Sequence, residues 1–114
     1  MPQPNYEALV KQLVSEKASE RKVAQMILLS MQEDAIEPLA DQYFAGVTDA
    51  EGNAILSMIA EIGGYEAIHL LHDVFTHEAR PRLRRAAAMG LIKHIHALPQ
   101  AEREQVAQYL ADER

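Results

Sequence analysis

The sequence predicts an all-α protein, an α-α superhelix (solenoid) of about three antiparallel helical hairpins followed by a C-terminal capping helix. Apolar residues recur at spacings of three and four between the Gly and Pro residues, which is the pattern of amphipathic helices. The sustained period of two that strands require is absent, and β-branched residues are sparse. Several apolar residues also recur after 32 positions, which is typical of stacked repeats.

Seven helices are predicted, and each begins at a residue that favours a helix start. At the N-termini of the first two helices, Asn or Ser is expected to cap free backbone N–H groups. At the N-termini of the third and fourth helices, the residues have the spacing of a capping box. Gly-Gly precedes the fifth helix, and Pro, which is favoured in the first turn, begins the last two. The start signals in chain order are Asn5, Ser19, Asp34 with Glu37, Thr48 with Glu51, Gly63-Gly64, Pro81 and Pro99. The predicted helices are about Asn5–Glu16, Ser19–Gln32, Asp34–Ala45, Asp49–Ile62, Tyr65–His77, Pro81–His96 and Pro99–Asp112.

The length and the short connections predict how these helices are organised. A chain of 114 residues fits one domain, here residues 1–114. Helices joined by two to four residues pack antiparallel to their neighbours in the chain. We therefore expect hairpins at about residues 5–32, 34–63 and 65–98, with a cap helix at 99–112.

A shift of 32 residues aligns apolar positions in both helices of the hairpins. In the first helices, Ala35-Ile36 recurs as Ala67-Ile68. In the second helices, the shift aligns three sets of residues. The first set is Val23, Ile55 and Ala87, and the second is Met26, Met58 and Gly90. The third set is Ile27, Ile59 and Leu91, and we expect these three residues to occupy equivalent buried positions. Because glycine inside a helix costs about 1 kcal/mol relative to alanine, Gly90 predicts a close approach between helices.

The repeat resembles the HEAT-like family, in particular the short bacterial repeats typified by phycobilisome lyases. The segments that carry the resemblance are Glu66–Leu71 for a first helix, Leu83–Leu91 for a second helix, and Ile59–Gly63 for the end of a second helix. Glu51-Gly52 and Met31-Gln32 depart from the family pattern. The resemblance covers about residues 5–98 and implies a fold that binds other molecules, without implying a particular chemistry.

Composition and charge exclude several classes of function. The 17 acidic and 11 basic residues give a net charge of −6, which repels nucleic acids and anionic membranes. Without cysteine there is no disulfide, thiolate metal site or thiol nucleophile. No apolar run is long enough to span a membrane, and Met1–Asn5 has no apolar signal core, so we expect a cytoplasmic protein.

The histidines are the one group of candidate metal ligands. His69, Asp73 and His77 are spaced four residues apart, with His72 beside them, and zinc can use two imidazoles and a carboxylate at such spacing. The buried stripe of the same helix places these side chains toward water, so we favour a solvated polar face and predict neither a metal nor a cofactor. His94 is expected to be a semi-buried packing residue and His96 to be more accessible.

Four arginines, Arg80, Arg82, Arg84 and Arg85, form the one basic concentration. A basic concave surface binds DNA in some HEAT-like folds, but the net charge and the absence of Trp argue against nucleic acid here. Pairing with Glu51 or Glu78, or with a protein partner, fits these arginines better. No serine has a Gly-x-Ser-x-Gly context and no glycine loop cradles phosphate, so we predict that the protein is not an enzyme.

The second helices are expected to line a concave face that binds another protein, because they carry exposed residues beyond the buried stripe. The predicted partner-binding residues are Arg21, Gln25, Leu28, Asn53, Ser57, Arg85, Met89 and Ile92. Met89 and Ile92 are also suited to packing on the last helix, and an ordinary surface with scattered apolar residues is the other reading. The predicted function is a protein-interaction or scaffold module, itself an oligomer or a subunit of a larger assembly. The resemblance also raises an alternative, an accessory subunit of a bilin lyase or a similar protein-modifying complex.

Overall fold

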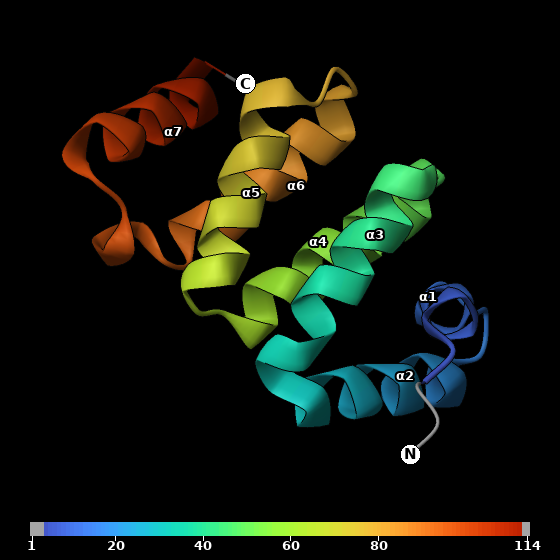
Figure 1. Ribbon diagram of the computed structural model, residues 1–114. Helices are drawn as coiled ribbons and strands as arrows, with labels where there is room; N and C mark the ends of the chain where they lie inside the picture. The colour runs from blue at the N-terminus through green and yellow to red at the C-terminus, as the bar shows by residue number, and fades with distance from the viewer. Residues whose placement is uncertain (1–3, 113–114) are drawn as a thin grey trace.

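The computed structural model describes residues 4–112, and these are helical with no strand (Figure 1). The fold class is therefore all-α, as predicted. None of the described helices is long and apolar enough to cross a membrane. The elements in chain order are α1 (Tyr6–Leu13), α2 (Ala18–Met31), the 3-10 turn η1 (Gln32–Ala35), α3 (Ile36–Ala45), α4 (Asp49–Ile62), α5 (Tyr65–His77), α6 (Pro81–Ile92), the 3-10 turn η2 (Ile95–Ala97) and α7 (Gln100–Asp112).

Local signals at three helix boundaries act as predicted. The Asn5 side chain accepts a hydrogen bond from the Ala8 N–H at 3.1 Å and so caps α1. Both halves of the Thr48–Glu51 capping box are formed at the start of α4. Gly63 and Gly64 have φ values of 73° and 95°, in the left-handed region that glycine adopts without steric cost, and they form the turn between α4 and α5.

Four predicted boundaries are wrong. Ser19 does not cap α2, because this helix begins at Ala18 and its N-cap, Lys17, forms no side-chain cap hydrogen bond. Asp34 and Glu37 form no capping box, because η1 runs directly into α3 without a side-chain cap. Helix α1 ends at Leu13, and the backbone then turns so that the Ser15 carbonyl accepts a 2.6 Å hydrogen bond from Arg21 Nη1. Helix α6 ends at Ile92 rather than at His96. His94 leaves helical geometry, and its Nε2 lies 2.8 Å from the Ala60 carbonyl oxygen of α4.

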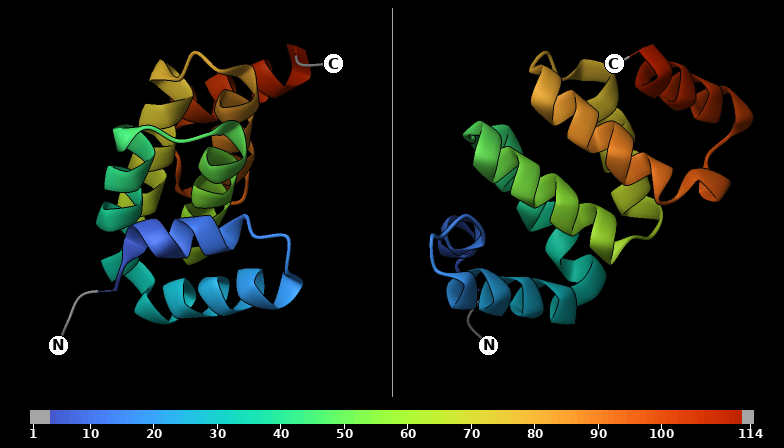
Figure 2. Two further views of the ribbon diagram at one scale, coloured as in Figure 1. Left: turned by 90° about the vertical axis from the view of Figure 1, so that its right-hand side faces the viewer. Right: turned by 180° about the vertical axis from the view of Figure 1, so that it is seen from behind.

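Helices α4 and α6 run in the same direction, as second helices of successive hairpins must (Figure 2). At their N-terminal ends, a Cβ added to Gly52 of α4 would stand 2.9 Å from Leu83 Cδ1 of α6. At their C-terminal ends, a Cβ added to Gly90 of α6 would stand 3.1 Å from the Ala60 Cβ. Small residues at both ends therefore hold the two helices close together, which confirms the close approach predicted from Gly90.

The first hairpin departs from the repeat. Ile59 and Leu91 are fully buried as predicted, but Ile27 is 38% exposed, so the prediction for Ile27 is wrong. Helix α2 instead buries Ala24 and Leu28, one position further along the helix. The reason lies in α1, which packs in the angle between α2 and the α3–α4 hairpin and contacts all three helices (Figures 1 and 2).

Candidate binding groove

A groove of about 330 Å³ lies between α4 and α6, and it contains five of the eight predicted partner-binding residues. Asn53 and Ser57 reach it from α4, and Arg85, Met89 and Ile92 reach it from α6. We call this surface the α4/α6 groove. Its other lining residues are Ala60, Arg82, Ala86, Gly90 and Lys93.

The floor of the α4/α6 groove is built from small residues. Ala60, Ala86 and Gly90 line it, and the close approach of Gly90 to Ala60 leaves no room there for larger side chains. Met89 and Ile92 stand beside this floor and remain 50% and 36% exposed. Packing against α7, the alternative predicted for these two side chains, therefore covers at most part of each. The groove offers a flat apolar strip with two raised apolar side chains.

The rim of the groove is basic although the whole chain is acidic. Arg82 and Arg85 are exposed, and no described residue forms an ion pair with either. Lys93 Nζ lies 3.6 Å from Glu61 Oε2, and both of these side chains are more than half exposed. An exposed pair of this kind contributes little to stability and exchanges partners readily. The groove therefore presents at least two cations that are available to an anionic group.

The other two arginines of the basic cluster are used inside the fold. Arg80 pairs with Glu78 at 3.2 Å and with Asp49 at 3.6 Å, and it donates to the Val47 carbonyl at 2.8 Å. The predicted pairing with Glu78 is thus confirmed for this arginine. Burial acts to raise the pKa of Glu78, but hydrogen bonds from Arg80 and Tyr43 and the Arg80 charge outweigh it and lower that pKa to about 2.

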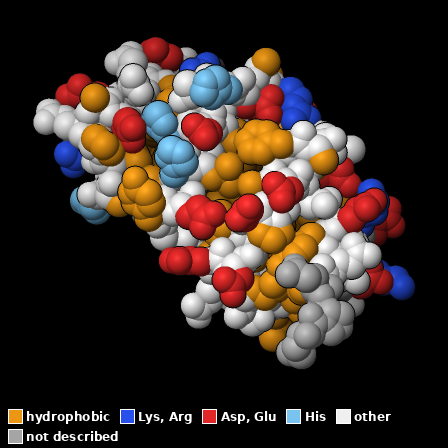
Figure 3. All heavy atoms as spheres, in the orientation of Figure 1, with side chains coloured by type: hydrophobic (Ala, Val, Ile, Leu, Met, Phe, Trp, Pro, Cys, Tyr) orange, Lys and Arg blue, Asp and Glu red, His pale blue; other side chains and the backbone are white. Residues whose placement is uncertain are grey.

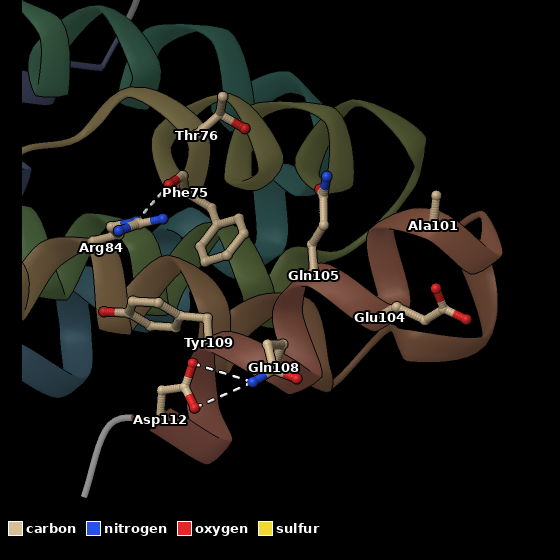
Figure 4. Close-up of a pocket in the computed structure, with 9 residues that line it drawn as sticks. All are labelled: Phe75, Thr76, Arg84, Ala101, Glu104, Gln105, Gln108, Tyr109 and Asp112. Carbon is tan, nitrogen blue, oxygen red and sulfur yellow. Dashed lines mark hydrogen bonds between the residues drawn. The ribbon is translucent and has the colours of Figure 1, made fainter.

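Arg84 joins α6 to α7 beside a hollow of about 830 Å³ (Figure 4). Its Nε donates to the Phe75 carbonyl at 3.0 Å. Its guanidinium carbon lies 5.1 Å from the centre of the Phe75 ring and 4.7 Å from that of the Tyr109 ring, which is cation–π geometry. This arginine is therefore occupied in packing.

The predicted residues of α2 are placed less regularly. Gln25 and the neighbouring Leu29 line a second hollow, of about 390 Å³, which shares Ser57 and Lys93 with the α4/α6 groove. Arg21 is half-buried and lines neither hollow. Leu28 is fully buried, so the expectation that it is exposed on this face is wrong. Leu29 takes its place on the surface at 38% exposure.

Sequence reasoning missed Arg82, Leu29, Glu61 and Lys93 on this face. The repeat contained a signal for three of them, because Leu29, Glu61 and Lys93 are spaced 32 residues apart. The same shift relates Gln25, Ser57 and Met89, which were predicted. Applying the same 32-residue shift to the residues one helical turn later would have identified Leu29, Glu61 and Lys93.

The histidines do not gather into a metal site. His69 and Asp73 are exposed and lie 4.0 Å apart, while His77 Nδ1 lies 3.0 Å from the Asp73 carbonyl oxygen, and Figure 3 shows histidine side chains at the surface over this region. His72 is directed elsewhere, with its Nε2 3.8 Å from Glu102 of α7. Among residues 4–112, no three side chains of the metal-ligating types are grouped to hold an ion. His94 is half-buried and His96 exposed, as predicted.

Comparison with protein-family models, with curated proteins and with solved structures found no match to this chain. The function is therefore inferred from the geometry and chemistry of the α4/α6 groove. That groove combines a flat apolar floor, two protruding apolar side chains and an uncompensated basic rim.

Proposed function

We propose that this chain is a non-enzymatic, HEAT-like protein-interaction module that holds a partner protein on the face formed by α2, α4 and α6. One observation carries the proposal. The α4/α6 groove brings Asn53, Ser57, Arg85, Met89 and Ile92 together along one surface, although they come from two helices that are far apart in the chain. Met and Arg are enriched at protein interfaces, and both lie on this surface.

The chemistry of the groove favours a partner segment that carries both apolar and acidic residues. The small floor accommodates a backbone or a helix at close range, and the exposed parts of Met89 and Ile92 provide apolar area to bury. Arg82 and Arg85 are placed to pair with carboxylates at the rim, where charge directs association more than it adds affinity.

The same lining residues argue for binding rather than catalysis. The groove has one hydroxyl, that of Ser57, and its lining includes no histidine or carboxylate to act as a base toward it. An interaction surface needs no such pair.

The proposal is tested with the double variant Arg85→Glu/Met89→Ala. The matched control is Lys17→Glu/Tyr65→Ala, which reverses one exposed charge and truncates one exposed apolar side chain at positions that line neither hollow of this face. Both variants should melt close to the parent, because none of the four side chains is buried. Proteins captured from native lysate by the parent are identified, and the affinity of each purified partner for the parent and both variants is measured.

We expect a partner whose affinity for Arg85→Glu/Met89→Ala falls by at least about 2 kcal/mol while its affinity for the control is unchanged. If every captured partner binds the double variant as tightly as the parent, the interaction surface lies elsewhere. If the double variant unfolds, Arg85→Ala and Met89→Ser are measured singly under the same criterion.

A further inference from the structure

Helix α2 exposes an apolar stripe that the other hairpins bury. Val23 and Ile27 are 52% and 38% exposed. The residues 32 positions later, Ile55 and Ile59, are fully buried, and so are Ala87 and Leu91 another 32 positions on. Met26, between the two on the same face, is 63% exposed. We refer to Val23, Met26 and Ile27 as the α2 stripe.

The stripe is open because α1 is placed differently from the other first helices. Helix α1 packs in the angle between α2 and the α3–α4 hairpin (Figure 2). The side chains of the α2 stripe remain exposed beside it. In the following hairpins the equivalent residues are covered by helices of the chain itself. The surface left open in the first hairpin is therefore one that an amphipathic helix fits.

A hollow of about 870 Å³ adjoins this stripe at Ile27. Tyr6 and Met31, both half-buried, give it an apolar floor beside Ile27. Five carboxylates stand around the hollow, and no Lys or Arg lines it. Figure 3 shows carboxylates and apolar side chains intermingled across the middle of this face. The acidic residues are Glu33, Asp34, Glu37, Asp41 and Glu66.

These carboxylates have no counter-ion among residues 4–112. No ion pair with a described Lys, Arg or His involves any of the five. The local field also acts on Tyr6, whose pKa is raised by burial and, after that, by the Asp34 carboxylate. An apolar stripe beside five unpaired negative charges selects an occupant that is apolar on one face and positively charged at its edges.

We propose that the α2 stripe and the adjoining acidic hollow bind a basic amphipathic helix of a partner protein. Apolar side chains at helical spacing of the bound helix lie on Val23 and Ile27, and its Lys or Arg residues face Asp34, Glu37 and Asp41. A second copy of this chain is a poorer occupant, because it brings a net charge of −6 to an already acidic face. This surface is separate from the basic α4/α6 groove and takes a ligand of the opposite charge.

The probe is a fluorescently labelled Leu/Lys peptide of about 14–18 residues, long enough to form a helix, with Leu at positions three and four apart. Its binding to the full chain is followed by fluorescence anisotropy. Two variants test the surface: Val23→Ser/Ile27→Ser removes the apolar contacts, and Glu37→Lys/Asp41→Lys reverses the charges. Two further variants are controls. Met89→Ser removes from the α4/α6 groove an apolar side chain about as exposed as Val23, and Glu104→Lys/Asp112→Lys makes the same charge change on α7.

We expect saturable binding that weakens at least about tenfold in both test variants and changes less than about twofold in both controls. A peptide of the same composition with the Leu residues scattered should bind at least about tenfold more weakly than the amphipathic one. The proposal is overturned if the scattered peptide binds equally well, or if Glu104→Lys/Asp112→Lys weakens binding as much as Glu37→Lys/Asp41→Lys. It is also overturned if the parent sediments as a dimer and Val23→Ser/Ile27→Ser sediments as a monomer, because a second copy then covers the stripe.

Discussion

Gly90 of α6 lies against Ala60 of α4, and a Cβ added to Gly90 would stand 3.1 Å from the Ala60 Cβ and 3.2 Å from Leu71 Cδ1. The contact joins α6 to α4, the second helix of the preceding hairpin. Leu71 brings in α5, the first helix of the hairpin that contains α6. The same pair of residues forms part of the floor of the α4/α6 groove. One glycine thus sets both the spacing of the helices and the shape of the candidate binding surface.

We expect Gly90→Leu to lower the free energy of unfolding by roughly 1–3 kcal/mol, because the added side chain has no space between α4, α5 and α6. Thermal or urea melts measure this. Met89→Leu is the matched control, since it alters the neighbouring residue at a half-exposed position. A Gly90→Leu variant as stable as the parent would contradict the close packing at this site.

Thr48→Ala should destabilise the protein by about 0.5–2 kcal/mol, because it removes the acceptor for the Glu51 N–H. In the parent, Thr48 Oγ1 accepts from this N–H at 3.1 Å, and Glu51 Oε1 accepts from the Thr48 N–H at 3.0 Å. The control is Thr76→Ala, whose hydroxyl donates to the His72 carbonyl within α5 and caps no N–H group. Equal urea midpoints for the two variants would argue against the capping role.

Arg84→Lys should loosen α7 and lower stability by about 1–2 kcal/mol, because an ammonium group cannot contact both aromatic rings and also donate to the Phe75 carbonyl as the planar guanidinium does. Hydrogen exchange should then quicken in α7 more than in α3. Arg85→Lys, an exposed change one residue away, should leave exchange in α7 as it is in the parent. Unchanged protection of α7 in Arg84→Lys would show that Val106 and Leu110 hold this helix without the arginine.

Glu78→Gln should remove a pH-dependent contribution to stability. The pKa of Glu78 falls from 4.5 to about 2 in the folded state, so its carboxylate stabilises the fold above pH 4.5. That stabilisation is lost as the pH falls from 4.5 toward 2. We therefore expect Glu78→Gln to melt below the parent at pH 7, and the difference to shrink as the pH is lowered through this range.

Glu16→Gln is the control for this titration, because Glu16 is exposed and pairs with no described residue. Its melting temperature should follow that of the parent at every pH. A constant gap between Glu78→Gln and the parent from pH 7 down to pH 3 would mean that the variant acts through packing and not through the charge of Glu78.

Boundaries that depend on local chemistry could be read from the sequence. Helices α4 and α5 begin and end where predicted, because a capping box, two glycines with positive φ and the periodic apolar residues all lie within a few residues of the ends they define. The α4/α6 groove was predictable for the same kind of reason. One 32-residue shift relates Asn53 to Arg85 and Ser57 to Met89, and both hairpins keep that register.

The first hairpin shows what periodicity leaves undecided. Helix α2 carries two adjacent apolar stripes, one with Val23 and Ile27 and the other with Ala24 and Leu28. Their spacing is the same, so the pattern alone cannot choose which of the two is buried. The position of α1 makes the choice. The end of α6 was undecided in the same way, since it depends on a contact between His94 and Ala60, which are 34 residues apart.

The all-helical class, the starts of most helices and the residues of α4 and α6 that share a face could therefore be derived from the amino-acid sequence. Three features emerge only when the helices are packed: Leu28 is buried, Ile27 is exposed, and an acidic hollow adjoins the exposed stripe of α2. The difference is the distance along the chain over which each interaction acts. Caps, turns and periodicity act over a few residues, whereas burial depends on which helix covers each face, and that is settled only when distant segments pack together.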